Sequence, residues 1–101
     1  MIALSAAAEA ALDALTEHYA ALGRDRAIDR LIECVETACA RYEARPRRGR
    51  FLDAPRPYPK LADLGFRWTK EGSYWVAFQE TGAGPVVAGI FYETADIPNR
   101  L

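Results

Sequence analysis

The chain has 101 residues, of which 13 are basic and 14 are acidic, so its net charge at pH 7 is −1. This length is typical of a single domain with one modest core, and we take residues 1–101 as one domain. No apolar run approaches the roughly 18 residues that a membrane span requires, and the apolar start has no basic leader. We therefore expect a cytoplasmic protein without a signal peptide or a membrane span.

The chain opens with a short apolar stretch, residues 2–4, that predicts an edge strand. Ser5 can then cap a helix over residues 6–22, because its hydroxyl can accept from the free amides of the first turn. Gly23 is a natural place for this helix to end. Its apolar residues recur every three or four positions and form one stripe, made of Ala8, Leu12, Leu15, Tyr19 and Leu22.

A second helix is predicted over residues 26–44, with Asp25 as its cap. Pro46 prevents the helix from continuing, because proline removes a backbone donor and clashes with the preceding turn. Because only a short link separates the two helices, we expect them to fold back on each other as a hairpin. The apolar stripe of the second helix contains Ile28, Leu31, Ile32, Val35, Cys39 and Tyr42.

Cys34 and Cys39 lie five residues apart on the second predicted helix. Helix geometry places their Cα atoms about 8–9 Å apart, which is too far for a disulfide. We therefore expect free thiols, as in a reducing compartment. The single histidine, His18, belongs to the other helix, so we expect no metal site and no cofactor.

Residues 45–64 form a long connection that is rich in proline and arginine. Residues 41–70 contain nine basic and three acidic side chains, whereas the segments on both sides are acidic. A local positive field of this kind can attract an acidic partner or a phosphate backbone. A solvated arginine-rich loop without a ligand, or a disordered stretch, explains the same composition. Within the connection, residues 61–64 predict a single helical turn.

From residue 66 the hydrophobic period changes from that of a helix to that of a strand. Residues 66–70 and 74–78 alternate around a turn, and residues 86–91 form a third strand after a glycine-rich turn. Consecutive strands with short links pair as an antiparallel meander. We expect the helix hairpin to be the only cover for its apolar face, so the predicted fold class is α+β. Trp68 is assigned to the core, and Trp75 is left to be covered by the connection or by a partner.

Several short motifs follow one another at a characteristic spacing. They are a Pro-x-x-Gly after the second helix, a Gly-aromatic-Arg strand opening, a Gly-Ser-aromatic turn, an aromatic residue near the end of that strand, and an Asp after the last strand. The residues are Pro46 and Gly49; Gly65, Phe66 and Arg67; Gly72, Ser73 and Tyr74; Phe78; and Asp96. With the order strand, two helices and three strands, the chain resembles the ParE-like toxins of the RelE/ParE superfamily, also called plasmid stabilisation proteins.

The resemblance implies the toxin of a type II toxin–antitoxin system, neutralised by a ParD-like antitoxin in a hetero-oligomer. The ParE branch poisons DNA gyrase by binding, and the RelE branch cleaves mRNA on the ribosome. In a nuclease, Arg67 and Lys70 would bind phosphate and Tyr92 would be the acid. No general base accompanies these residues, so we favour gyrase inhibition without catalysis over the nuclease alternative. A non-toxic relic that keeps only antitoxin binding is a third alternative.

Two sets of residues become candidates for binding. The antitoxin segment, which would lie across the helices and the sheet, is assigned to three aromatic residues, Tyr19, Tyr58 and Trp75. For Arg67, a structural ion pair with Glu80 or Asp96 is the alternative to a role in binding. The contact with gyrase and its DNA is assigned to six arginines: Arg47, Arg48, Arg50, Arg56, Arg67 and Arg100.

Overall fold

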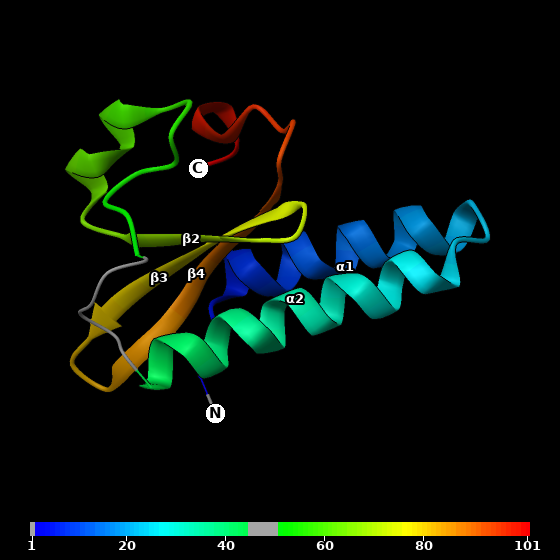
Figure 1. Ribbon diagram of the computed structural model, residues 1–101, viewed down its shortest axis with the longest axis horizontal. Coiled ribbons are helices and arrows are strands. Elements are labelled where there is room, and N and C mark those ends of the chain that lie inside the picture. Colours follow the sequence, from blue (N-terminus) through cyan, green and yellow to red (C-terminus); the bar gives the residue numbers. More distant parts are fainter. Residues whose placement is uncertain (1, 45–50) are drawn as a thin grey trace.

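The computed structural model describes residues 2–44 and 51–101. Four strands form one sheet in the order β1-β4-β3-β2. The α1–α2 hairpin lies against one face of this sheet, and the 3-10 helices η1 and η2 lie on the other side (Figure 1). This arrangement confirms the α+β prediction. The elements are β1 (Ala3–Leu4), α1 (Ala6–Ala21), α2 (Asp25–Ala44), η1 (Pro59–Leu64), β2 (Arg67–Glu71), β3 (Tyr74–Thr81), β4 (Gly84–Tyr92) and η2 (Ile97–Arg100).

The two long helices begin and end close to the predicted residues. The amide of Ala8 donates to Oγ of Ser5 at 3.1 Å, which confirms Ser5 as the cap of α1. The link between the helices turns at Gly23, whose φ of +68° lies in the left-handed region. Asp25 is the first residue of α2 rather than its cap. An acidic side chain is favoured at both positions, because each lies at the positive end of the helix dipole.

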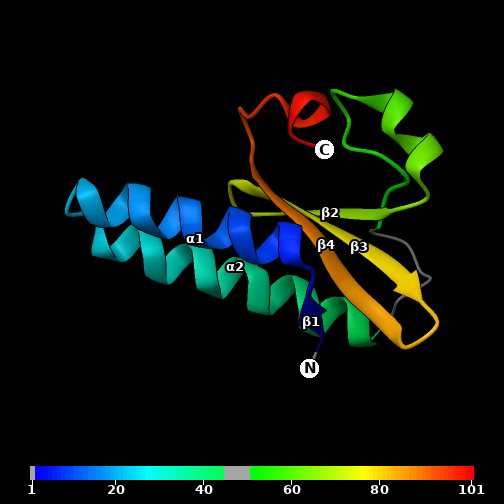
Figure 2. The same ribbon diagram turned by 180° about the vertical axis from the view of Figure 1, so that it is seen from behind.

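Strands β2, β3 and β4 form the antiparallel meander that the alternating pattern predicts. The register places Val76 between Thr69 of β2 and Ile90 of β4. β1 joins the other edge of the sheet parallel to β4, so the sheet is mixed (Figure 2). The sequence predicts the edge position of β1, but two residues of strand are too few for a pattern to fix its direction.

One hydrophobic cluster fills the space between the sheet and the hairpin, as predicted. Tyr42 of α2 stacks on Phe78 of β3 with ring centroids 4.3 Å apart, and Phe51 meets both rings edge-on. Leu31 and Ala38 of α2 are fully buried in the same cluster. The apolar surface removed from water here is what holds the hairpin against the sheet.

A second hydrophobic cluster lies on the opposite face of the sheet, which corrects the expectation that the hairpin is the only cover. It contains Trp68, Trp75, Ala77, Phe91 and Ile97. The cover is supplied by the connection after residue 51 and by the C-terminal segment that includes η2. Trp68 is a core residue as predicted, since none of it is exposed, but it belongs to this second core.

The connection is tied to the sheet at Leu52. Backbone hydrogen bonds of 2.7 Å run in both directions between Leu52 and Trp68, so Leu52 extends the sheet beyond β2. The helical turn predicted at residues 61–64 is confirmed as η1, which starts earlier, at Pro59. Pro46 and Gly49, which carry the first of the family-like motifs, lie outside the described residues.

Candidate functional site

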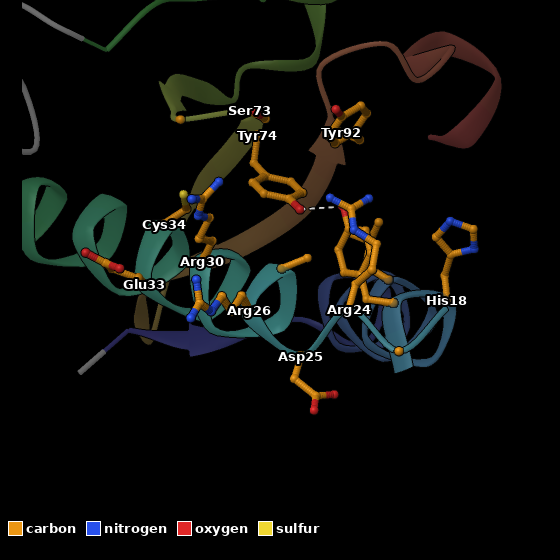
Figure 3. A pocket seen from close by; sticks show the side chains of 15 residues that line it. His18, Arg24, Asp25, Arg26, Arg30, Glu33, Cys34, Ser73, Tyr74 and Tyr92 are labelled. Carbon is orange, nitrogen blue, oxygen red and sulfur yellow. Dashed lines mark hydrogen bonds between the residues drawn. The ribbon is translucent and has the colours of Figure 1, made fainter. Parts of the chain in front are cut away.

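An open groove of about 1140 Å³ lies where the end of the helical hairpin meets the β2–β3 turn and the end of β4 (Figure 3). Aromatic rings and guanidinium groups dominate its wall, and both groups are common in binding surfaces. The lining residues are Leu15, His18, Tyr19, Gly23, Arg24, Asp25, Arg26, Ala27, Arg30, Glu33, Cys34, Gly72, Ser73, Tyr74 and Tyr92.

Two tyrosines from different layers meet in this groove. The hydroxyls of Tyr19 in α1 and Tyr74 in β3 are hydrogen-bonded to each other, and both side chains are buried. Burial, followed by the hydrogen bond to Tyr19, raises the pKa of Tyr74 above the ordinary tyrosine value, so its phenol is protonated at neutral pH. The ring of Tyr92 packs edge-on against Tyr74 at 5.6 Å and is 39% exposed. The groove therefore has the protonated phenol of Tyr74 in its wall and an accessible aromatic ring beside it.

Three arginines surround the first turns of α2 at this groove: Arg24, Arg26 and Arg30. The guanidinium of Arg24 lies over the ring of Tyr19, 5.6 Å from its centroid. Among the described residues none forms an ion pair with any of the three. Like charges four residues apart repel, and cations oppose the dipole at a helix start, which together disfavour the arrangement by about 1 kcal/mol. A cluster of cations that no carboxylate of the described residues pairs with is a candidate for binding an anionic group.

This cluster is not visible in the charge balance of the sequence when charges are summed over segments of thirty to forty residues. Arg24, Arg26 and Arg30 belong to residues 1–40, in which seven acidic side chains outnumber them. The sequence signal for the cluster lies within a few residues. Arg26 and Arg30 are four residues apart at the start of a predicted helix, where cations are disfavoured.

Cys34 forms part of the groove wall beside the β2–β3 turn. Gly72 turns there with a φ of +55°, and a Cβ on it would lie 3.0 Å from Sγ of Cys34. Burial raises the pKa of the Cys34 thiol, the nearby carboxylates raise it further, and Arg30 opposes this shift. Burial likewise raises the pKa of Cys39. Both thiols are free, as predicted, and their raised pKa values keep them protonated and slow to react at neutral pH.

The three residues of the nuclease alternative do not share a site. Arg67 and Lys70 occupy positions of opposite parity in β2, so they point to opposite faces about 10 Å apart along the strand. Tyr92 lies opposite Tyr74, at the other end of the meander from Arg67. Nζ of Lys70 is 3.8 Å from the Glu93 carboxylate. The structure therefore does not bring two cations and a phenol around one reacting phosphate.

The arginines assigned to the target divide into three groups. Arg47, Arg48 and Arg50 lie outside the described residues. Arg56, in the connection, and Arg100, in η2, are exposed and form no ion pair with any described residue.

Arg67 is different, because its side chain is held within the chain. Nη1 lies 3.2 Å from the Asp53 carboxylate, and Nη2 donates to the carbonyl of Phe51 at 3.4 Å. An ion pair was the structural alternative for this residue, but the partner is Asp53 rather than Glu80 or Asp96.

The three aromatic residues assigned to the antitoxin lie on different faces of the sheet. Tyr19 lines the groove. Trp75 is 5% exposed in the second core, and Tyr58 packs against that core and donates its hydroxyl to the carbonyl of Ala95 at 3.3 Å. Tyr19 alone of the three borders the groove, so these residues do not form one continuous surface.

Two other kinds of feature are not found in the described part of the chain. Residues 2–44 and 51–101 contain no group of three or more side chains that could hold a metal ion. No helix among them combines the length and the apolar character needed to cross a bilayer. Comparison of the chain with protein-family models, with curated proteins and with solved structures finds no match in any of the three.

Proposed function

We propose that this chain is a ParE-like toxin that arrests growth in the cytoplasm by inhibiting DNA gyrase and is neutralised by a ParD-like antitoxin. The fold supports the proposal, because the order β1-α1-α2-β2-β3-β4 with a helical hairpin on one face is the order that the resemblance implies. A fold alone does not assign an activity, so the proposal rests also on the groove and on the exposed arginines.

The observation that carries the proposal is the contrast between the groove and the nuclease candidates. The groove gathers three unpaired arginines and three tyrosines, whereas Arg67, Lys70 and Tyr92 lie on two faces of the sheet. A toxin that acts by binding needs a partner surface and does not need an acid and a base aligned on one bond. In this proposal the antitoxin occupies the groove beside Tyr19, and Arg56 and Arg100 contact the target.

The two alternatives make different demands on the same residues. An mRNA endonuclease would need Arg67 free to bind phosphate, but Arg67 is held by Asp53 and by a backbone carbonyl. A non-toxic relic would keep the groove for the antitoxin and would have lost the contact with a target. Growth after induction separates the relic from both kinds of toxin.

The test is induction of the chain in bacterial cells with and without the adjacent antitoxin gene. We expect growth arrest with a DNA-damage response from the chain alone, and normal growth on co-expression. The double variant Arg56→Ala/Arg100→Ala should reduce the arrest, and the variant Lys60→Ala, which removes an exposed positive charge that is assigned to neither surface, should not. Normal growth of cells that accumulate the folded chain alone would contradict the proposal.

A further inference from the structure

The two tyrosines in the groove leave one hydroxyl proton without an acceptor. Each phenol carries one proton, and the single hydrogen bond between Tyr19 and Tyr74 uses only one of the two. Neither hydroxyl has another hydrogen-bond partner within the described residues. Both side chains are more than nine-tenths buried and both line the groove. Because a buried donor without an acceptor is unfavourable, the second proton calls for an acceptor from the open groove, which water supplies until an accepting group of a ligand replaces it.

Guanidinium groups flank this pair in the groove. In the close-up view, the guanidinium of Arg30 lies to one side of the Tyr74 ring and that of Arg24 to the other (Figure 3). The carboxylate of Asp25 points away from Tyr74, and Glu33 lies at the end of the groove far from His18. Two guanidinium groups and one spare phenol proton define a site for a group that only accepts hydrogen bonds and carries negative charge.

The charge around the groove distinguishes between two kinds of anion. Its lining holds three arginines against two carboxylates, Asp25 and Glu33, and the rest of residues 1–40 adds five acidic side chains and no basic one. A nucleic acid would bring many phosphates against this acidic surface, and its binding would lack the broad positive face that phosphate backbones require. A short acidic peptide brings only a few charges, and one of its carboxylates can meet the arginines while the others stay in solvent. The observations therefore favour a peptide.

We propose that the groove binds an acidic peptide segment by one of its carboxylates, which accepts from Arg24 and Arg30 and from the spare hydroxyl of the tyrosine pair. Arg26, at the edge of the cluster, strengthens the local field without direct contact. The exposed ring of Tyr92 provides an apolar side for the neighbouring residue of the peptide. This inference rests on the proposed function only in naming the antitoxin as the source of the segment.

The test uses the purified chain and capped hexaglutamate peptide at neutral pH, with capped hexaglutamine as the matched neutral peptide. Isothermal titration should show binding of hexaglutamate and none of hexaglutamine. Loss of a charge-assisted hydrogen bond typically weakens binding about tenfold or more, so Arg24→Gln and Arg30→Gln should each have an effect of that size. Arg26→Gln should have a smaller effect, and Lys60→Gln should have none.

The tyrosine pair is tested by a double substitution, because either hydroxyl can supply the spare proton. Replacing both buried partners by apolar rings of the same shape leaves no unpaired group, so Tyr19→Phe/Tyr74→Phe should fold. It should bind hexaglutamate several-fold more weakly than the unaltered chain does. If this variant does not fold, the arginine variants still test the site.

Three outcomes would overturn the inference. They are equal binding of hexaglutamine and hexaglutamate, an equal effect of Lys60→Gln and Arg30→Gln, and stronger binding of inorganic phosphate or a hexathymidylate strand than of hexaglutamate. Growth arrest that the adjacent gene relieves, together with no binding of hexaglutamate, would reject the carboxylate site and leave the proposed function standing. Binding of hexaglutamate without growth arrest would reject the proposed function and leave the carboxylate site standing.

Discussion

The hydroxyls of Tyr19 and Tyr74 are hydrogen-bonded to each other across the boundary between α1 and β3. The two residues are 55 positions apart in sequence. Their bond is therefore a direct polar link between the helical layer and the sheet, at the wall of the groove that we assign to a partner. The same bond has consequences for stability and for pH dependence.

Removing one hydroxyl of this pair should destabilise the fold more than removing both. Tyr74→Phe leaves the buried Tyr19 hydroxyl without its partner, and the expected loss in the free energy of unfolding is about 1 kcal/mol. Tyr19→Phe/Tyr74→Phe should lose less than either single variant, because it leaves no unpaired hydroxyl. Urea denaturation of the four proteins measures this coupling. Additive losses would show that the hydroxyls do not depend on each other.

The raised pKa of Tyr74 should make the fold sensitive to alkaline pH. Its causes are burial first, then the hydrogen bond to Tyr19. Because the folded chain holds this proton more tightly than the unfolded chain, the stabilising contribution is complete below about pH 10, the ordinary tyrosine pKa, and is lost as the pH rises toward the folded value. Between about pH 10 and pH 12, stability should fall more steeply for the unaltered chain than for Tyr74→Phe, by up to about 1 kcal/mol per pH unit. Urea denaturation across this range checks the difference, and parallel slopes would contradict it.

The ion pair between Arg41 of α2 and Glu71 of β2 should contribute more to the stability of the fold than the exposed pair between Lys70 and Glu93. Nη1 of Arg41 lies 2.8 Å from Oε1 of Glu71, whose side chain is only 11% exposed. Arg41 and Glu71 form a charge contact rather than a well-aligned hydrogen bond. Oε1 of Glu71 has no hydrogen-bond partner of good geometry within the described residues. Arg41→Ala removes the cation that the described residues place within ion-pair distance of this largely buried carboxylate, so we expect a loss of about 1–2 kcal/mol.

The pair between Lys70 and Glu93 serves as the comparison for Arg41→Ala. Their charged atoms are 3.8 Å apart, and both side chains are more than a third exposed. Exposed pairs of this kind contribute little, so Lys70→Ala should change stability by less than about 0.5 kcal/mol. Thermal unfolding of both variants under the same conditions ranks the two pairs. A larger loss for Lys70→Ala would show that burial of Glu71 does not decide the effect.

The sequence predicts most of the elements because their signals are local. The three-to-four spacing through Leu12 and Tyr19 identifies α1, Ser5 marks its start, and the alternation through Val76 and Phe78 identifies β3. Each of these signals depends on residues within one or two turns, or on one pair of faces. The hairpin and the meander follow because short links force neighbouring elements together.

The second core and the groove depend on contacts between residues that are distant in sequence. No periodic pattern could show that Ile97 would cover Trp68 and Trp75, since the connection and the C-terminal segment that bring them together have no regular period. Tyr19 was assigned to the antitoxin segment because the resemblance places that segment across the helices and the sheet, but its bond to Tyr74 is a tertiary contact. The sequence could therefore supply candidate residues for the groove without showing which of them meet.

The most direct test of the account is a comparison of two reactions with the same purified chain. One reaction is the supercoiling of plasmid DNA by gyrase, and the other is the cleavage of message on translating ribosomes. We predict that the chain inhibits supercoiling, that a ParD-like antitoxin from the adjacent gene reverses this inhibition, and that the message stays intact. Cleavage of the message that Arg67→Ala abolishes, with supercoiling unaffected, would contradict the account.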